Sequence, residues 1–432
     1  MTTTGTILAG WAVAGITPDV PCWMGGYGAR TAPAECVHDP LSAQALALGS
    51  ATEPLVLVIS DLLSVDRAMV QEVRHRVMTG LPGATVWLGA THTHAGPDIG
   101  RLLPLPSRGP DPLIIERIVA GCVRAAVEAV AAMRPMRLGW TSGVVDGVAT
   151  NRDHPGSGEE IALDLLCLFD PREDDSPALP TAILGSFPCH PTVLSADNRE
   201  ISADLPGAFR RQLRALIGSN PWVALATGAA GDISTRHTRQ RQGFAELERL
   251  GGLLARRAYQ LLSQAQPLRP GVPLVRQETI VLEPQARPTP ETLETHARTL
   301  LERMEAERQA GNIAQARTLE TALQGIAAAR QITAAHDPAL LQVEIAVAAV
   351  GELGLVAIPG ELYNSLGAAI RHRTGAPVLL LGYTNGYVGY LPTREAYTTL
   401  DYEVLMSPFA PGSGERLSSA AITMLKGLLS TS

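Results

Sequence analysis

The chain has 432 residues, with 35 basic and 42 acidic side chains and a formal net charge of −7. The sequence contains no block of basic residues, so we do not expect nucleic acid as a partner. Hydrophobic residues make up 46% of the chain and aromatic residues only 4%, which predicts a large core built mainly from Ala, Leu and Val. No apolar run approaches about 18 residues, so we expect no membrane-spanning segment.

The N-terminal segment and the cysteines bear on where the protein works. Residues 1–11 lack the positively charged start of a signal peptide, and Gly10, Gly15 and Pro18 break the apolar stretch. The five cysteines are odd in number and show no Cys-x-x-Cys spacing, which favours reduced thiols over a disulfide framework. We therefore expect a cytoplasmic protein.

Up to about residue 285, short apolar runs alternate with amphipathic helical patterns. The predicted strands cover residues 55–60, 84–90, 163–169, 182–187 and 222–227. The predicted helices cover residues 65–78, 112–133, 206–217 and 245–264. Alternation of this kind predicts an α/β fold, a layered domain with a mixed β-sheet and flanking helices in which strand ends furnish the site.

Residues 288–335 depart from this alternation. Thr289-Pro290 is a helix start, with the threonine as N-cap, and Gly311-Asn312 separates this helix from a second one. We interpret the segment as a solvent-facing helical hairpin inserted in one domain of residues 1–432, because no linker or repeat divides the chain. Strands are predicted to resume after it, at residues 341–350, 355–358 and 378–381.

Two histidines follow the predicted strand 84–90, in the sequence Thr91-His92-Thr93-His94. Because side chains alternate along a strand, His92 and His94 are expected to share a face where the strand runs into a loop. Two imidazoles in that position can be metal ligands, or one ligand beside an acid/base group. A pair of polar strand-end residues without a chemical role is the alternative.

Two other apolar runs also end in a group that can bind a metal. His190 closes one of them, and Pro191 stops the strand there. Glu361 follows the other, which Pro359-Gly360 terminates at the start of a predicted helix over 362–371. A metal site assembled from separate strands would show this pattern, although Glu361 alone could serve only the helix dipole.

Two further segments combine small residues with polar or aromatic ones. Residues 382–390 contain three tyrosines and three glycines, which suits the wall of a site better than a core. Gly231-Asp232-Ile233-Ser234 follows a predicted strand, and its small residues bring the backbone close to a ligand. Ser234 can be a nucleophile, a hydrogen-bond donor or a turn residue, and no GxSxG elbow of an α/β-hydrolase surrounds it.

In this order the motifs resemble those of the neutral ceramidase family, which comprises zinc-dependent amide hydrolases. The matching segments are Met24–Gly28, Thr91–Pro97, Asn151-Arg152, His190 with Asp204–Gly207, Gly231–Ser234, Pro359–Glu361 and Asn385–Glu403. The resemblance spans the family's catalytic domain. Typical members carry a further C-terminal immunoglobulin-like domain, whereas this chain ends at Ser432, so we expect the catalytic domain only.

The resemblance implies a role for eight residues. They are the Zn²⁺ ligands His92, His190, Glu361 and Tyr390, the acid/base or carbonyl-polarising residue His94, the substrate or oxyanion contacts Arg152 and Tyr402, and the family's proposed nucleophile, Ser234. Tyr390 and Tyr402 keep the family's twelve-residue separation. On this basis we expect a Zn²⁺-dependent hydrolase in which metal-activated water attacks an amide.

One departure from the family pattern bears on the substrate. Members usually continue Gly-Asp-Val-Ser with Pro-Asn, whereas this chain has Thr235-Arg236-His237, with Arg239 close behind. Cations beside the site would favour a polar or anionic group over a second alkyl chain. We therefore expect a small, soluble N-acyl amide as the substrate rather than long-chain ceramide.

Three alternatives remain at the level of sequence. Ser234 could be the nucleophile of an amidase or esterase. The chain could be a non-catalytic protein that keeps a metal for structure or for ligand binding, and against this stands the second imidazole, His94. A lyase or isomerase could use the same metal site.

Overall fold

A computed structural model describes residues 5–100, 111–172, 179–332 and 341–431, and in these ranges the strands form one sheet of nine strands, one of four and three two-stranded pairings. The large sheet has the order β11-β9-β8-β6-β1-β3-β4-β5, with β13 beside β6. Its strands are β1 (Ile7–Gly15), β3 (Ser42–Gly49), β4 (Pro54–Ser60), β5 (Thr85–Ala90), β6 (Arg134–Val144), β8 (Ala162–Phe169), β9 (Ala182–Phe187), β11 (Trp222–Thr227) and β13 (Gln266–Leu268).

The large sheet is mixed. β4 pairs with β5 and β9 with β11 in parallel, and the other pairs are antiparallel. The predicted α/β class with a mixed sheet and flanking helices is therefore confirmed. The predicted strands 182–187 and 222–227 coincide with β9 and β11, and the other strands of this sheet that were predicted differ by one residue at their start.

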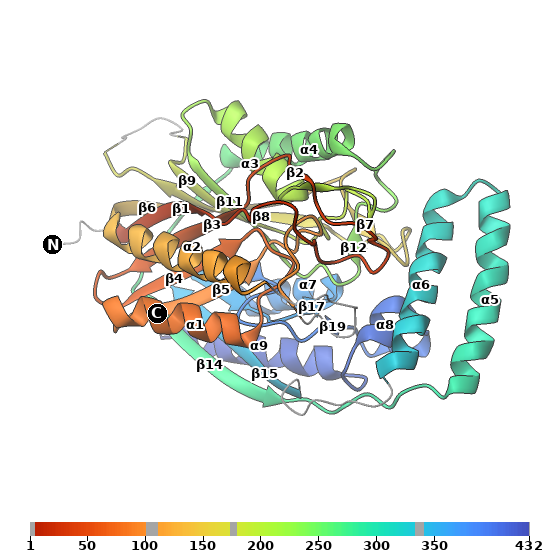
Figure 1. Cartoon of the computed structure of the whole chain (residues 1–432). Helices are drawn as coiled ribbons and strands as arrows, with labels where there is room; N and C mark the ends of the chain where they lie inside the picture. Colours follow the sequence, from red (N-terminus) through yellow and green to blue (C-terminus); the bar gives the residue numbers. More distant parts are fainter. Residues whose placement is uncertain (1–4, 101–110, 173–178, 333–340, 432) are drawn as a thin grey trace.

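Helices cover one face of the large sheet (Figure 1). They are α1 (Arg67–Gly80), α2 (Pro112–Ala131), α3 (Asp204–Ile217) and α4 (Phe244–Leu262). Helix α1 starts two residues later than predicted because Asp66 is its N-cap, and the Asp66 carboxylate accepts the Met69 N–H at 2.7 Å. Leu205, Leu247 and the valines of α1 belong to the same hydrophobic core as Ala43, Ala45 and Ala47 of β3, the strand on which α2 packs.

The smaller sheet covers the opposite face of the large one. Its strands are β14 (Leu274–Val281), β15 (Gln342–Val350), β16 (Leu353–Ala357) and β18 (Val378–Leu381), in that order. Leu46, Leu57 and Trp87 of the large sheet pack against Leu355 and Leu379 of the small one. Helices α7 (Asn364–Thr374) and α9 (Ser413–Leu429) lie outside the small sheet, so the molecule has four layers, helix, sheet, sheet and helix.

Because both faces of the large sheet are covered, its strands are apolar on both sides. In β4, Val56 and Val58 face the helices, whereas Leu55, Leu57 and Ile59 face the second sheet. This arrangement explains why the strands read as continuous apolar runs and not as alternating ones.

A helical hairpin projects beside the layers (Figure 1). It consists of α5 (Pro290–Gln309) and α6 (Ile313–Ile332), and the side chain of the predicted N-cap Thr289 accepts the Thr292 N–H. Helix α6 packs on the short helix α8 (Tyr402–Met406). Residues 333–335 of the predicted hairpin lie outside the described residues, and its status as an insertion in one domain stays a prediction.

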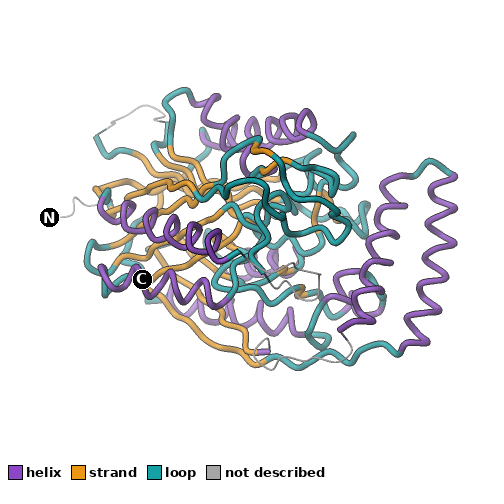
Figure 2. Tube along the Cα trace, in the orientation of Figure 1, coloured by secondary structure: helices purple, strands orange, loops and turns teal. Residues whose placement is uncertain are grey.

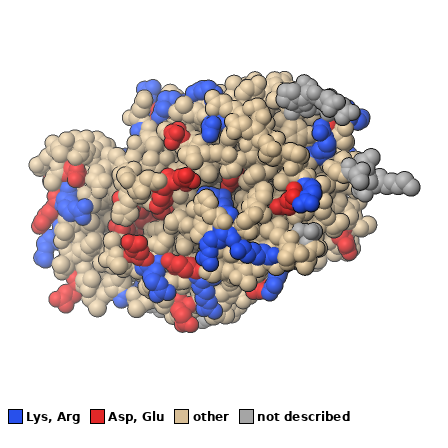
Figure 3. Space-filling view, turned by 180° about the vertical axis from the view of Figure 1, so that it is seen from behind, with Lys and Arg blue, Asp and Glu red and all other residues tan. Residues whose placement is uncertain are grey.

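The remaining described elements are short and lie mostly among the loops. They are β2 (Cys36–Val37), β7 (Thr150–Asn151), β10 (Glu200–Ile201), β12 (Ile233–Ser234), β17 (Glu361–Leu362), β19 (Tyr390–Leu391) and a 3₁₀ turn over Glu395–Thr398. Figure 2 shows loops gathered between the sheets and the hairpin. Seen from behind, the surface carries charged side chains of both signs among uncharged ones (Figure 3). Across the described ranges, no helix combines the length and apolarity needed to cross a bilayer.

Candidate metal centre

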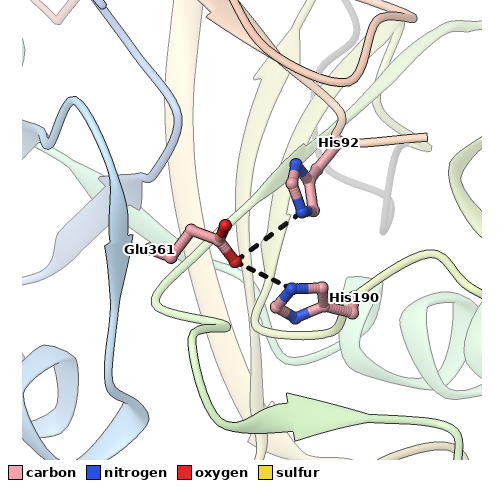
Figure 4. Close-up of side chains that lie close together, drawn as sticks. All are labelled: His92, His190 and Glu361. Carbon is pink, nitrogen blue, oxygen red and sulfur yellow. Dashed lines mark ion pairs between the residues drawn. The ribbon is translucent and has the colours of Figure 1, made fainter. Parts of the chain in front are cut away.

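Three buried donor groups converge beyond the ends of β5, β9 and β16 (Figure 4). His92 follows β5, His190 follows β9 and Glu361 follows β16, and their donor atoms all lie within 4.8 Å of one another. Oε2 of Glu361 is 2.8 Å from Nε2 of His190 and 3.7 Å from Nε2 of His92. Each of the three residues is at most 2% exposed.

The two imidazoles are oriented by the backbone. Nδ1 of His92 lies 2.6 Å from the Leu63 carbonyl oxygen, and Nδ1 of His190 lies 2.6 Å from that of Ala230. A carbonyl oxygen only accepts, so Nδ1 carries the proton in both rings and each Nε2 presents a lone pair. Burial lowers the pKa of His92 to about 4 and that of His190 well below its ordinary value, which keeps both rings neutral.

The lone pairs on Nε2 of His92 and Nε2 of His190 face a lone pair on Oε2 of Glu361. Although Nε2 of His190 is 2.8 Å from Oε2, it finds no hydrogen-bond partner among the described residues, because this nitrogen carries no proton when Nδ1 is protonated. Two nitrogen lone pairs and one carboxylate oxygen that converge in a buried space repel one another unless a cation lies among them. Two imidazoles and a carboxylate are a donor set that fits Zn²⁺.

His92 and His94 lie together, but strand alternation is not the reason. Strand β5 ends at Ala90, two residues before His92, and His92 has the left-handed φ of 64°. The two rings are almost perpendicular, at 89°, in a T-shaped contact with centroids 4.9 Å apart, and their Nε2 atoms are 3.4 Å apart. A left-handed non-glycine residue stores strain of about 1–3 kcal/mol, which persists only where the surrounding structure fixes it.

Glu361 is positioned by a strand pair and not by a helix. Its two-residue strand β17 pairs in parallel with β19, and its N–H donates to the Gly389 carbonyl at 3.0 Å. Helix α7 begins at Asn364, two residues after the predicted start. The carboxylate points to the histidines, so compensation of a helix dipole does not describe it.

Two tyrosine hydroxyls contact the Glu361 carboxylate, one at each oxygen. Tyr387 donates a short hydrogen bond to Oε1, and Tyr383 donates to Oε2 at 3.4 Å. The Tyr383 ring also stacks on His92 with centroids 4.1 Å apart. Burial raises the pKa of both phenols well above the ordinary value, so both remain donors. Sequence analysis missed both residues individually, and the tyrosine cluster at 382–390 was its only signal.

Arg152, Tyr390 and Tyr402 lie next to this centre. The Arg152 guanidinium donates to the Tyr390 hydroxyl at 3.1 Å and to Glu403 Oε1 at 2.6 Å. The ring of Tyr390 is stacked 6.4 Å from that of His190, and Tyr402 meets Tyr390 edge-on at 5.8 Å. Burial, the largest single effect, would lower the pKa of Arg152, but Glu403 together with Tyr390, Asp153 and Glu361 outweighs it, so the pKa lies well above the ordinary value. Glu403 is a further residue that sequence analysis missed.

His94 differs from the other two histidines because the backbone does not fix its tautomer. Its Nδ1 is buried and finds no hydrogen-bond partner among the described residues. The ring lies 4.8 Å from that of Tyr27. Burial, and then the neighbouring His92 and His190, lower the pKa of His94 well below the ordinary value, so the imidazole is neutral.

Ser234 is a chain neighbour of residues whose backbone orients His190. Among the described residues, no basic side chain is hydrogen-bonded to its hydroxyl group. Its Oγ accepts the Arg236 N–H at 3.2 Å, an arrangement typical of a turn. His190 forms an isolated β-bridge with Ser234. No hydrogen bond joins the serine hydroxyl to a histidine side chain in the ranges that the structure describes.

The arginine side chains after Ser234 bind other groups of the protein, whereas the sequence predicted that they favour a polar or anionic substrate group. The Arg236 guanidinium donates to Thr318 and Thr321 of α6, at 3.3 and 3.2 Å. Arg239 donates to the Thr192 carbonyl at 2.8 Å. The side chain expected to favour an anionic substrate group, Arg236, thus connects the loop to the hairpin, because its long stem reaches the α6 hydroxyls.

The free space at the centre is small. The described residues leave a cavity of about 30 Å³ there. Its walls include His92, His94, Glu361, Tyr387, Tyr390 and Tyr402. A cavity of this size holds about one water molecule. All the predicted site residues except His190, Arg152 and Ser234 therefore line one space.

Comparison with known proteins agrees with this description. No profile of a known protein family matches the chain. A neutral ceramidase from Mycobacterium tuberculosis (strain ATCC 25618 / H37Rv) is 24% identical over 91% of this chain and 72% of its own length. The crystal structure of neutral ceramidase from Pseudomonas aeruginosa superposes with a TM-score of 0.78 at 20% identity, over 99% of this chain and 75% of that one. A ceramidase complexed with C2 gives a TM-score of 0.76 at 19% identity, over 99% of this chain and 76% of that one. The resemblance to the neutral ceramidase family is thereby confirmed.

Proposed function

We propose that this protein is a zinc-dependent hydrolase that cleaves the amide bond of small N-acyl compounds. The observation that carries the proposal is the convergence of two backbone-oriented imidazole lone pairs and one carboxylate oxygen in a buried space. Neutral ceramidases, which this chain resembles in sequence and fold, make amide hydrolysis the chemistry that this site fits best.

The residues that would hold the ion are His92, His190 and Glu361, with Tyr390 as the predicted fourth ligand. Zinc in such a site supplies Lewis-acid chemistry, because it makes water more acidic and polarises a carbonyl group. Burial, and then Glu361, raise the pKa of Tyr390 well above the ordinary value, and Arg152, 3.1 Å from its hydroxyl, opposes that rise. Tyr390 would therefore have to give up its proton to a bound metal ion in order to serve as a ligand.

The remaining groups fit the steps of amide hydrolysis. His94 is neutral and its Nδ1 finds no hydrogen-bond partner among the described residues, so it can take a proton from the attacking water and return it to the leaving amine. Arg152 is held by Glu403, and its positive charge lies beside the cavity that Tyr402 lines. These two donors would stabilise the negative charge that develops on the carbonyl oxygen.

The competing mechanism makes Ser234 the nucleophile. A serine hydroxyl is a weak nucleophile unless a base removes its proton. The contact of Ser234 Oγ with the Arg236 N–H supports a turn role instead. An acyl group trapped on Ser234 during turnover would decide for the serine mechanism.

A small substrate fits the space better than a two-chain lipid. The cavity of about 30 Å³ has room for a reacting carbonyl and little else. Helix α6 lies next to it, since Gly325 packs against Tyr402 and Thr318 contacts the Arg152 carbonyl. A long alkyl chain would have to displace this packing.

Metal analysis combined with a substrate screen tests the proposal. We expect about one zinc per chain, loss of most of it in His190→Ala, and hydrolysis of N-acyl amides that a chelator abolishes and zinc restores. His75→Ala, at an exposed position on α1, is the matched control and should keep both zinc and activity. Unchanged zinc content in both His92→Ala and His190→Ala, or metal binding without hydrolysis of any amide, would refute the proposal.

A further inference from the structure

The two oxygens of the Glu361 carboxylate have different contacts. Oε2 faces the histidines, at 2.8 Å from Nε2 of His190 and 3.7 Å from Nε2 of His92. Oε1 accepts the hydrogen bond of the Tyr387 hydroxyl. The backbone of Glu361 is fixed by the β17–β19 pair, so the hydroxyl acts on the orientation of the carboxylate and not on the position of the chain.

We propose that Tyr387 is a positioning residue that makes Glu361 a one-oxygen ligand. A carboxylate binds a metal through one oxygen or through both, and an oxygen engaged by a strong donor is the weaker ligand. Tyr387 engages Oε1, whereas Oε2 has only the long 3.4 Å contact with Tyr383, so Oε2 is the oxygen that would bind beside His92 and His190. One coordination position then stays open for water or substrate, as a catalytic zinc site requires. This inference rests on the proposed zinc site and adds a role that the family resemblance did not assign.

The surroundings of Tyr387 agree with this role. Its side chain is half-buried and lines the same cavity as Glu361. Its ring runs nearly parallel to that of Tyr383, with centroids 6.5 Å apart and an angle of 19°. Tyr383 itself is fully buried and stacked on His92, and its 3.4 Å contact with Oε2 is too long to hold the carboxylate.

The test removes the hydroxyl and measures metal binding directly. Tyr387→Phe keeps the ring, and Tyr397→Phe is its matched control, because the Tyr397 hydroxyl donates to the Phe409 carbonyl away from the centre. Affinity for zinc is measured on metal-free protein by competition with a chelator. The visible spectrum of the cobalt-loaded protein reports the coordination number. Thermal unfolding of the metal-free variants checks that each one folds.

We expect Tyr387→Phe to bind zinc about 10- to 100-fold more weakly, the usual effect of removing a partner of a metal ligand. We also expect its cobalt spectrum to change towards a higher coordination number as Oε1 becomes a ligand. Tyr397→Phe should match wild type in both. If Tyr387→Phe does not fold, Tyr387→Met, which also lacks a donor, is measured in its place.

Two outcomes separate the two proposals. Wild-type zinc affinity and an unchanged cobalt spectrum in the hydroxyl-free variant would overturn the role of Tyr387 and leave the zinc site intact. Failure of the wild-type protein itself to bind zinc would refute the proposed function instead.

Discussion

Gly26 lies against the imidazole of His94, so the smallest substitution at Gly26 tests what that histidine does. A Cβ atom built on Gly26 would lie 2.5 Å from Nδ1 of His94 and 2.6 Å from its Cγ. An ordinary contact begins at 3.4 Å, so Gly26→Ala forces the ring to move by roughly 1 Å. Gly26 also has the left-handed φ of +95°, which an alanine adopts only at a cost of about 1–3 kcal/mol.

The two effects predict different measurements. A displacement of about 1 Å in a positioned catalytic group costs on the order of 10²-fold in rate. We therefore expect kcat/KM for an N-acyl amide to fall about 10²-fold in Gly26→Ala. Zinc content should stay at the wild-type level, because His92, His190 and Glu361 are held by contacts that do not involve Gly26. The backbone strain should lower the free energy of unfolding by about 1–3 kcal/mol.

Gly147→Ala separates strain from displacement. Gly147 has a φ of +74° and would present its Cβ to open space, so it shares the strain of Gly26→Ala without the clash. We expect Gly147→Ala to be destabilised by a similar amount and to keep its activity. If Gly26 acts through His94, the double variant with His94→Ala should be no slower than His94→Ala alone. Wild-type kcat/KM in a folded Gly26→Ala protein, or full additivity of the two losses, would refute the assignment of His94 as the proton carrier.

Four further predictions follow from the same structure. His94→Ala should retain zinc and lose about 10²- to 10⁴-fold in kcat, and release of the metal would make His94 a ligand instead. Ser234→Ala should keep turnover within about tenfold of wild type, and a complete loss with the fold intact would favour the serine mechanism. In a panel of N-acyl amides, kcat/KM should fall as the acyl chain lengthens, and a preference for long-chain ceramide would contradict the proposed substrate. Burial raises the pKa of Asp164 to about 6, so the folded protein binds this proton more tightly than the unfolded chain, and stability falls as pH rises from about 4 to 6. Asp164→Asn should therefore remove about 2 kcal/mol of pH-dependent loss between pH 4.5 and 6.5, and urea unfolding of both proteins at these two pH values measures the difference.

The strands could be predicted from sequence because both faces of the large sheet are buried. Residues such as Val56 and Leu57 point to opposite faces, yet both meet an apolar layer, so β4 reads as an uninterrupted apolar run. The existence of a second sheet could not be predicted in the same way. An apolar run does not specify its partner, and the pairing of β14 with β15 joins residues such as Leu274 and Ala349 that are far apart in the chain.

Only those site residues that lie in motifs or directly after predicted strands could be predicted from the sequence. His190 and Glu361 stand directly after apolar runs, and the structure brings them together with His92, although their roles as ligands stay predictions. The contacts that orient these groups are not visible in the sequence. Arg152 and Glu403 are separated by 251 positions, and nothing local marks them as a pair.

The departure from the family pattern after Ser234 has its physical explanation in the hairpin. The Arg236 side chain reaches Thr318 and Thr321, two residues one turn apart on the same face of α6. Thr318 in turn donates to the carbonyl of Arg152, the residue whose guanidinium contacts Tyr390. A loop that ended in Pro-Asn would have no side chain long enough to make these bonds.

Helix α6 therefore contacts the site from two sides. On one side it binds the loop that follows Ser234, and on the other Gly325 packs so closely on Tyr402 that an added Cβ would lie 3.0 Å from the ring. Only a residue without a side chain allows this approach, and it places α6 directly over the helix that begins with Tyr402. We infer that the packing of α6 on the loop and on α8 would limit the size of the substrate, whereas the α6 hydroxyls already engage the charge of Arg236.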